Sequence, residues 1–163
     1  MSDALIFKVE GIAGHPGQKR GFSGVQHVHV SVLDSAVDDE MAVTGTFTGT
    51  VDGVEAAFTV TAPVDLTCTR CLTQWTESLE VTGSQHFSRT PDEDGYAIVD
   101  GTVDMSGPAT DELALAIPLA PLCKPDCKGL CPICGTDLNT DPCDGHPDDS
   151  DSPFASLKDL FDP

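Results

Sequence analysis

The spacing of the cysteines constrains this chain more than any other feature. Seven cysteines are present, beginning with the pair Cys68-Thr-Arg-Cys71. The others form a run that ends in a histidine: Cys123-x3-Cys127-x3-Cys131-x2-Cys134-x8-Cys143-x2-His146. Two thiolates separated by two residues can reach one zinc ion at about 2.3 Å, and the glycine after Cys134 permits the tight turn of a zinc knuckle. The pattern therefore predicts Zn²⁺ binding.

The ligand set has two interpretations. One site would use Cys127, Cys131, Cys134 and Cys143. All seven cysteines and His146 would instead supply two four-coordinate ions, with Cys68, Cys71 and Cys123 as further ligands, if Cys68 and Cys71 approach the second group across the fold. Sulfur and imidazole ligands with no evident open position favour a structural site over a catalytic one. Free thiols, an opportunistic disulfide or a thiol redox protein that uses Cys68 and Cys71 are the alternatives.

The compartment expected for the chain agrees with metal binding. The start, Met1 to Leu5, lacks the basic flank and apolar stretch of a signal peptide, and no apolar run is long enough to span a bilayer. We expect a cytoplasmic protein, with no membrane contact, whose thiols are kept reduced. An odd number of cysteines also fits a complete disulfide framework poorly.

Alternating apolar and polar residues dominate the first two thirds of the chain and predict strands. Asp52-Gly53 is a strong hairpin signal. The expected strands cover 25–32, 43–51, 55–62, 76–87 and 96–103, and residues 110–117 are a short helix or a strand. The predicted fold is β-rich α+β, with an antiparallel, barrel-like sheet, short helices and a zinc-stabilised C-terminal module. We expect a β-rich domain over 1–108, a helix with the cysteine-rich module over 109–147, and an acidic linker with a short amphipathic helix over 148–163.

The charge balance restricts the partners. The chain has 27 acidic and 8 basic residues, a net charge of −19, and such a surface repels phosphate backbones. Arg70, Lys124 and Lys128 stand beside the cysteines as a small basic exception. They could contact RNA, although steadying metal-bound thiolates needs fewer assumptions. His27 and His29 share one strand face and are expected to be merely exposed polar residues.

The two cysteine segments resemble those of the bacterial YceD family, which is described as large ribosomal RNA subunit accumulation proteins. The similarity covers residue 64 to the end. It is carried by Leu66–Leu72, by Pro118–Gly135, by Leu138-Asn139 through Cys143, and by Phe154–Lys158. Many relatives place a further cysteine two residues after the equivalent of Cys143, where this chain has Gly145 followed by His146.

The resemblance implies a non-enzymatic role in 23S rRNA accumulation and large-subunit assembly, with no small-molecule substrate. A chain this acidic should bind bare rRNA poorly and a lysine-rich protein well. We therefore expect it to bind a basic large-subunit ribosomal protein or a pre-50S particle, with indirect contact to 23S rRNA. Ribosomal protein L32 is the first candidate, because its gene often lies beside the family's gene. A direct rRNA-binding zinc module is the alternative.

Overall fold

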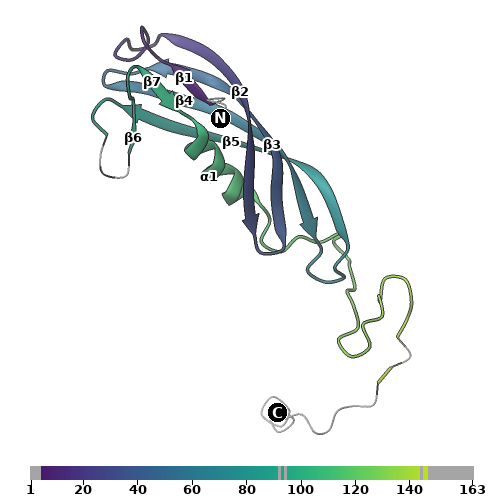
Figure 1. Ribbon diagram of the computed structural model, residues 1–163. Helices are drawn as coiled ribbons and strands as arrows, with labels where there is room; N and C mark the ends of the chain where they lie inside the picture. Colours follow the sequence, from purple (N-terminus) through teal and green to yellow (C-terminus); the bar gives the residue numbers. More distant parts are fainter. Residues whose placement is uncertain (1–4, 92, 94, 144, 147–163) are drawn as a thin grey trace.

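Four long strands form the body of the protein, in a sheet that curls into a half-barrel (Figure 1). The computed structural model describes residues 5–91, 93, 95–143 and 145–146. The sheet runs in the order β2 (Lys19–Val32), β3 (Ser35–Gly49), β4 (Gly53–Thr67), β5 (Gln74–Ser88) and β6 (Tyr96–Ala97), with only the last pair parallel. A second, two-stranded sheet pairs β1 (Ile6–Lys8) with β7 (Thr102–Asp104), and the helix α1 covers Ser106–Ala116.

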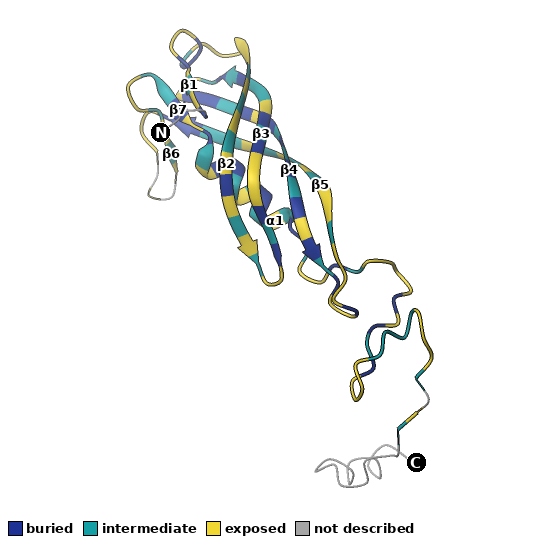
Figure 2. Cartoon of the chain, turned by 45° about the vertical axis from the view of Figure 1, so that its right-hand side comes forward, coloured by how far each residue is buried: buried dark blue, intermediate teal, exposed yellow. Residues whose placement is uncertain are grey.

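The alternation seen in the sequence gives the sheet two distinct faces. Along β4, even-numbered residues from Val54 to Leu66 are buried, whereas the odd-numbered ones are exposed or half-buried (Figure 2). Successive side chains of a strand point to opposite faces, so the even residues form the inner face. The core joins that face to β1, β7 and α1, with Phe22 stacked on Phe47 at a centroid distance of 4.1 Å. The predicted β-rich fold with a barrel-like sheet is confirmed.

Close packing at two glycines and an irregular stretch of β3 accompany the curl. A Cβ on Gly45 would lie 2.4 Å from the carbonyl oxygen of Ala57, and one on Gly49 would lie 2.3 Å from that of His15. The register of β3 on β4 shifts between Ala36 and Ala42. An irregularity of this kind bends a strand and increases its twist, which agrees with the curl of the sheet over α1 in Figure 1.

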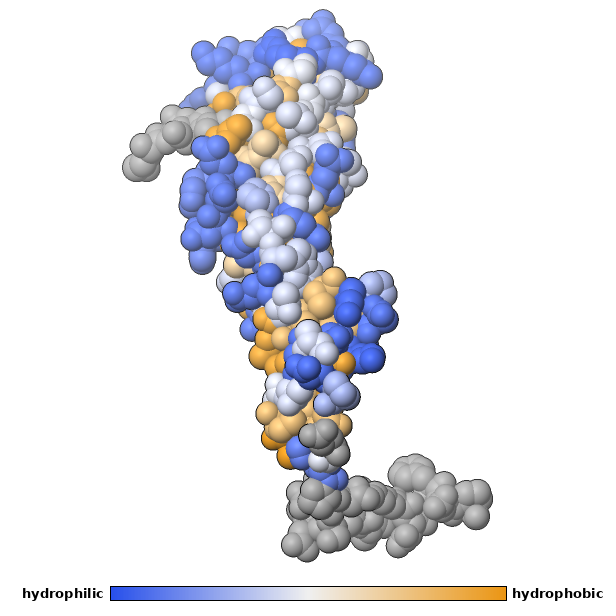
Figure 3. Space-filling view, turned by 90° about the vertical axis from the view of Figure 1, so that its right-hand side faces the viewer, coloured by the Kyte–Doolittle hydropathy of each residue, from blue (hydrophilic) through white to orange (hydrophobic). Residues whose placement is uncertain are grey.

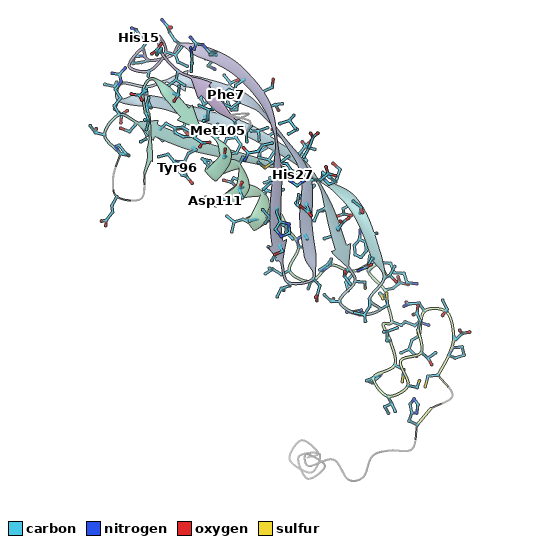
Figure 4. The ribbon with its side chains drawn as sticks, in the orientation of Figure 1. Phe7, His15, His27, Tyr96, Met105 and Asp111 are labelled. Carbon is cyan, nitrogen blue, oxygen red and sulfur yellow. The ribbon has the colours of Figure 1, made fainter. Side chains whose placement is uncertain are left out.

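The helix α1 lies against the inner face of the sheet and contacts β2, β4 and β5 (Figure 1). The hydroxyl of Tyr96 donates to Asp111 at 3.0 Å, and these two residues are labelled in Figure 4. Ser106 donates to Gln26 of β2 at 2.9 Å. Residues 110–117, left open between helix and strand, thus belong mainly to a helix that packs on the sheet.

The single strand expected at 96–103 is wrong. This stretch holds the two short strands β6 and β7, which belong to different sheets. Asp100 and Gly101 have φ of 49° and 73°, so they form a tight turn in which Val99 pairs with Thr102. Aspartate and glycine tolerate this left-handed conformation better than other residues do, and the turn separates the two strands.

Beyond α1 the chain runs to the far end of β4 and β5, where the cysteine-rich segment begins (Figure 1). Between residue 118 and residue 146, the described part contains turns and one isolated bridge, Leu130 with Asp137, but no helix or longer strand. The amphipathic helix expected near the C-terminus lies outside the described residues. Within the described residues, no helix has the length and hydrophobicity needed to span a membrane.

Candidate metal centre

The structure gathers the cysteines into two four-ligand groups at the far end of the sheet and in the segment beyond it. Figure 4 shows their sulfur atoms in yellow. The proximal group contains Cys68, Cys71, Cys123 and Cys127, and the distal group contains Cys131, Cys134, Cys143 and His146. Within each group the ligand atoms lie within 4.8 Å of one another. Each group could therefore hold one metal ion.

Distances within the proximal group fit a tetrahedral thiolate site. The sulfur atoms of Cys68 and Cys127 are 3.8 Å apart, and those of Cys71 and Cys123 are 3.5 Å apart. Four sulfurs at about 2.3 Å from a central zinc ion would be separated by about 3.8 Å. Cys68, Cys71 and Cys127 are buried, beside the half-buried side chains of Trp75, Leu122 and Leu130.

The distal group has the same arrangement with one nitrogen ligand. The sulfur of Cys143 lies 3.8 Å from that of Cys134 and 3.7 Å from that of Cys131. Nε2 of His146 lies 3.2 Å from the sulfur of Cys131 and 3.1 Å from that of Cys143. A zinc site would place such a nitrogen about 3.6 Å from each sulfur, so a small outward movement of the ring suffices.

Both groups are built on the same local turn. In the first, the amide of Cys68 donates to the carbonyl of Thr73 at 2.8 Å, and the amide of Leu72 donates to the carbonyl of Cys68 at 2.9 Å. In the second, Cys131 donates to Thr136 at 2.8 Å and Gly135 donates to Cys131 at 2.9 Å. The fifth position is left-handed in both, with φ of 60° at Leu72 and 74° at Gly135. The two cysteine pairs therefore form matching knuckles, although the sequence showed a glycine in only one.

Hydrogen bonds in the knuckles favour the thiolate form that binds metal. Backbone amides, first that of Cys123, lower the pKa of Cys68 to about 6. The hydroxyl and then the amide of Thr136 lower the pKa of Cys134 to about 6. Hydrogen bonding to the sulfur of Cys71, followed by desolvation, raises the pKa of Cys123 to about 12. Negative charge is thus favoured on selected sulfurs, which are the ones that already accept hydrogen bonds.

The basic residues beside the cysteines have different surroundings. Nη1 of Arg70 donates to the carbonyl of Cys127 at 2.8 Å, so this guanidinium helps to hold the proximal group together. Lys124 and Lys128 are exposed. Lys124 lies close enough to Asp137 to contribute to lowering the pKa of that carboxyl, although hydrogen bonds from Asn139 contribute more.

The grouping differs from the single set of Cys127, Cys131, Cys134 and Cys143. Cys127 lies with Cys68, Cys71 and Cys123, and His146 completes the other group. Spacing along the chain could not separate these sets, because it does not show which loop returns to the end of β4. His27 and His29 lie away from both groups on β2, where each faces Asp38, at 4.0 and 3.3 Å; His27 is labelled in Figure 4.

These features define the class of protein: a β-rich half-barrel followed by a cysteine-rich segment that could hold metal ions. The sequence model of the family described as "Large ribosomal RNA subunit accumulation protein YceD" matches residues 56–161. This chain belongs to the YceD family.

The curated relatives are uncharacterized mycobacterial proteins. A protein of Mycobacterium leprae is 40% identical over 121 residues, which are 69% of this chain and 55% of that protein. Proteins of Mycobacterium bovis and Mycobacterium tuberculosis are each 35% identical over 121 residues, which are 69% of this chain and 58% of theirs. The chain therefore spans little more than half the length of these relatives. No solved structure matches it.

Proposed function

We propose that this chain is a non-enzymatic, cytoplasmic, zinc-containing factor that supports 23S rRNA accumulation and assembly of the large ribosomal subunit. The observation that carries the proposal is the family match over residues 56–161, which include both cysteine groups. We further propose that the chain acts by binding a basic large-subunit ribosomal protein, with L32 as the first candidate, or a pre-50S particle. Its contact with 23S rRNA is then indirect.

The distribution of charge on the sheet supports a basic partner. Strands β3, β4 and β5 contain no lysine or arginine. Their acidic residues are all exposed or half-buried: Asp38, Asp39, Glu40, Glu55, Asp65, Glu77 and Glu80. Among the described residues, the ion pairs within 4.0 Å join histidines to carboxylates. An acidic surface whose own strands carry no lysine or arginine favours contact with the cationic side chains of a partner and disfavours contact with bare phosphates.

Part of this negative charge lines a groove at the far end of the sheet. It has a volume of about 490 Å³ and is lined where β3 begins, β4 ends and β5 begins. Asp34 and Asp65 are among its lining residues. Lysine or arginine side chains of an extended segment would meet two carboxylates here, so we place the first contact with the basic partner in this groove.

Exposed apolar side chains near the same end favour a protein partner over bare RNA. Leu72 is 62% exposed, Leu119 68% and Ile133 66%. Figure 3 shows hydrophobic residues gathering toward the cysteine-rich end, whereas hydrophilic residues cover the wide end of the sheet. Protein interfaces combine an apolar centre with a polar rim, and these residues could supply the apolar part.

Direct rRNA binding through Arg70, Lys124 and Lys128 is the second candidate. It is weakened because Arg70 already donates to Cys127 and because the two lysines are the only other cations in the stretch from residue 90 to residue 146. We call the first candidate, binding of a basic ribosomal protein with only indirect rRNA contact, the escort proposal. Reversing the charge of Lys124 and Lys128 should leave ribosomal protein binding nearly unchanged under the escort proposal and abolish RNA binding under the alternative. A thiol redox role ranks third, because Cys68 and Cys71 lie in a four-sulfur group that suits a bound metal.

The ribosomal role is tested by depleting the protein from cells and measuring the ratio of 23S to 16S rRNA before growth slows. A selective fall in 23S rRNA is the expected result. An unchanged ratio would require the ribosomal proposal to be withdrawn, whatever the metal content of the protein.

The partner is tested separately, by measuring binding of purified L32 and of naked 23S rRNA to the chain at physiological salt. We expect L32 to bind and rRNA not to bind. The double variant Asp34→Asn and Asp65→Asn should weaken L32 binding roughly threefold to tenfold, as loss of two exposed charges allows. The double variant Glu93→Gln and Asp100→Asn removes the same charge outside the groove and should bind like the unmodified chain. Strong rRNA binding without L32 would contradict the escort proposal.

A further inference from the structure

The segment between the two cysteine groups packs against the proximal group. Cys127 of the proximal group and Cys131 of the distal group are separated by Lys128, Gly129 and Leu130. The amide of Leu130 donates to the carbonyl of Arg70 at 3.0 Å, inside the proximal knuckle. A Cβ on Gly129 would lie 3.0 Å from that same carbonyl oxygen. The chain that leads into the distal group therefore rests directly on the proximal knuckle.

The rest of the distal loop is tied to this same short segment. Leu138 donates to the carbonyl of Gly129 at 3.0 Å, and the amide of Lys128 donates to the side chain of Asn139 at 2.9 Å. Asn139 in turn donates to the sulfur of Cys127 at 3.5 Å. These contacts need Cys127 and its neighbours to be in place, so the distal loop depends on the proximal group.

The proximal group depends less on the distal one. The backbone hydrogen bonds that close its knuckle join only Cys68, Leu72 and Thr73. The amide of Thr69 also donates to the carbonyl of Pro121 at 3.0 Å. Trp75, the second residue of β5, packs against the proximal group from the sheet. Its burial also differs, because three of its four cysteines are buried and only Cys123 is exposed, whereas only Cys131 of the distal group is buried.

We propose that the chain holds two metal ions of the zinc type in two separate sites, and that they form in a fixed order. The proximal site has four thiolate ligands, Cys68, Cys71, Cys123 and Cys127. The distal site has three thiolates and Nε2 of His146, and it forms only on a filled proximal site. This assignment does not depend on the ribosomal role and can fail or succeed independently of it.

Titration of the reduced, metal-free full chain with Co²⁺ tests both parts. Two equivalents should bind, and the tetrahedral Co²⁺ absorption should keep rising to the second. Trp75 is the only tryptophan and packs beside the proximal group, so most of its fluorescence quenching should accompany the first equivalent. The NMR signals of the His146 ring should shift only with the second. Saturation at one equivalent would overturn the two-site assignment, and a His146 shift during the first would overturn the order.

Matched ligand variants test the dependence directly, because Cys71 and Cys134 occupy equivalent positions in the two knuckles. Cys134→Ser should retain one zinc ion per chain. Cys71→Ser should retain none at the zinc concentration that saturates the unmodified chain, while circular dichroism still shows the sheet. If Cys71→Ser keeps a distal ion as tightly as the unmodified chain does, the proposed order is wrong.

A third variant tests the same dependence without removing a ligand, so its result does not depend on whether the cysteine variants fold. Gly129→Ala adds a methyl group against Arg70 at a residue whose φ is +78°. It should lower the affinity for the second equivalent of metal at least fivefold and affect the first much less. Equal weakening of both equivalents would contradict the proposed dependence of the distal site on this contact.

Discussion

The sheet and the cysteine-rich segment, residues 118–146, are ordered by different kinds of interaction. The core of the sheet consists of apolar side chains contributed by the four long strands, β1, β7 and α1. In the cysteine-rich segment, by contrast, the buried side chains include the thiols of Cys127 and Cys131, and few apolar groups accompany them. A segment with so little apolar surface to bury would gain its order from the metal ions proposed above, and its folding would then be coupled to metal binding.

The largest effect that should separate the two regions comes from Phe47→Ala. Phe47 is 1% exposed and stacks on Phe22, so its truncation should lower the free energy of unfolding by about 3–5 kcal/mol. The loss should be the same with and without zinc, because Phe47 lies in the sheet. Urea unfolding followed by circular dichroism measures it.

Leu115→Ala is the matched control, since Leu115 is 84% exposed and should change the free energy of unfolding by less than about 0.5 kcal/mol. A strong zinc dependence of the Phe47→Ala effect would mean that the sheet is not stabilised independently of the metal sites.

A smaller effect should distinguish the two knuckles. Gly135 has φ of 74° with no atom within 4 Å of an added Cβ, so Gly135→Leu introduces backbone strain of about 1–2 kcal/mol without a clash. Zinc affinity of the distal group should fall about 5- to 30-fold, because each 1.4 kcal/mol is a factor of ten. Competition with a chromophoric chelator measures the change.

The reciprocal variant Leu72→Gly relieves strain at the equivalent position of the first knuckle. Leu72 has φ of 60° and is 62% exposed, so little packing is lost. Its zinc affinity should be unchanged or slightly higher. A large loss would show that the leucine side chain, and not the turn alone, supports the proximal group.

The smallest effect is expected from His146→Cys, which replaces the nitrogen ligand of the distal group with a fourth sulfur. Zinc content should stay the same, because a thiolate suits zinc as well as imidazole does. The thiolate-to-Co²⁺ charge-transfer absorption should increase by the contribution of one additional Co–S bond. Loss of metal from the distal group would indicate that the backbone near His146 accommodates only the longer imidazole side chain.

Local patterns were enough to predict most of the sheet. The alternation in Val25–Val32 and Glu55–Ala62 continues through β2 and β4, and Asp52-Gly53 stands where β3 turns into β4. The exact extent of the strands could not be predicted. Residues 35–41 include Asp38, Asp39 and Glu40 on an irregular part of β3, where the apolar and polar residues do not alternate.

The residues of the candidate metal centre were predictable from the sequence, but their arrangement was not. Spacing identified every residue that the structure brings into the two groups. It could not pair Cys68 and Cys71 with Cys123 and Cys127, because Cys71 and Cys123 are 52 positions apart. Only the return of the chain past α1 brings them together. The left-handed turn at Leu72 was also hidden, since leucine rarely adopts that conformation.

Hydrogen exchange of the full chain, followed by mass spectrometry with and without a zinc chelator, tests the contrast between the two regions most directly. Peptides covering residues 118–146 should lose protection when zinc is removed, while peptides of β3, β4 and α1 keep theirs. Loss of protection throughout the chain in a single step would contradict this account, because the sheet would then owe its stability to the metal and not to its own apolar core.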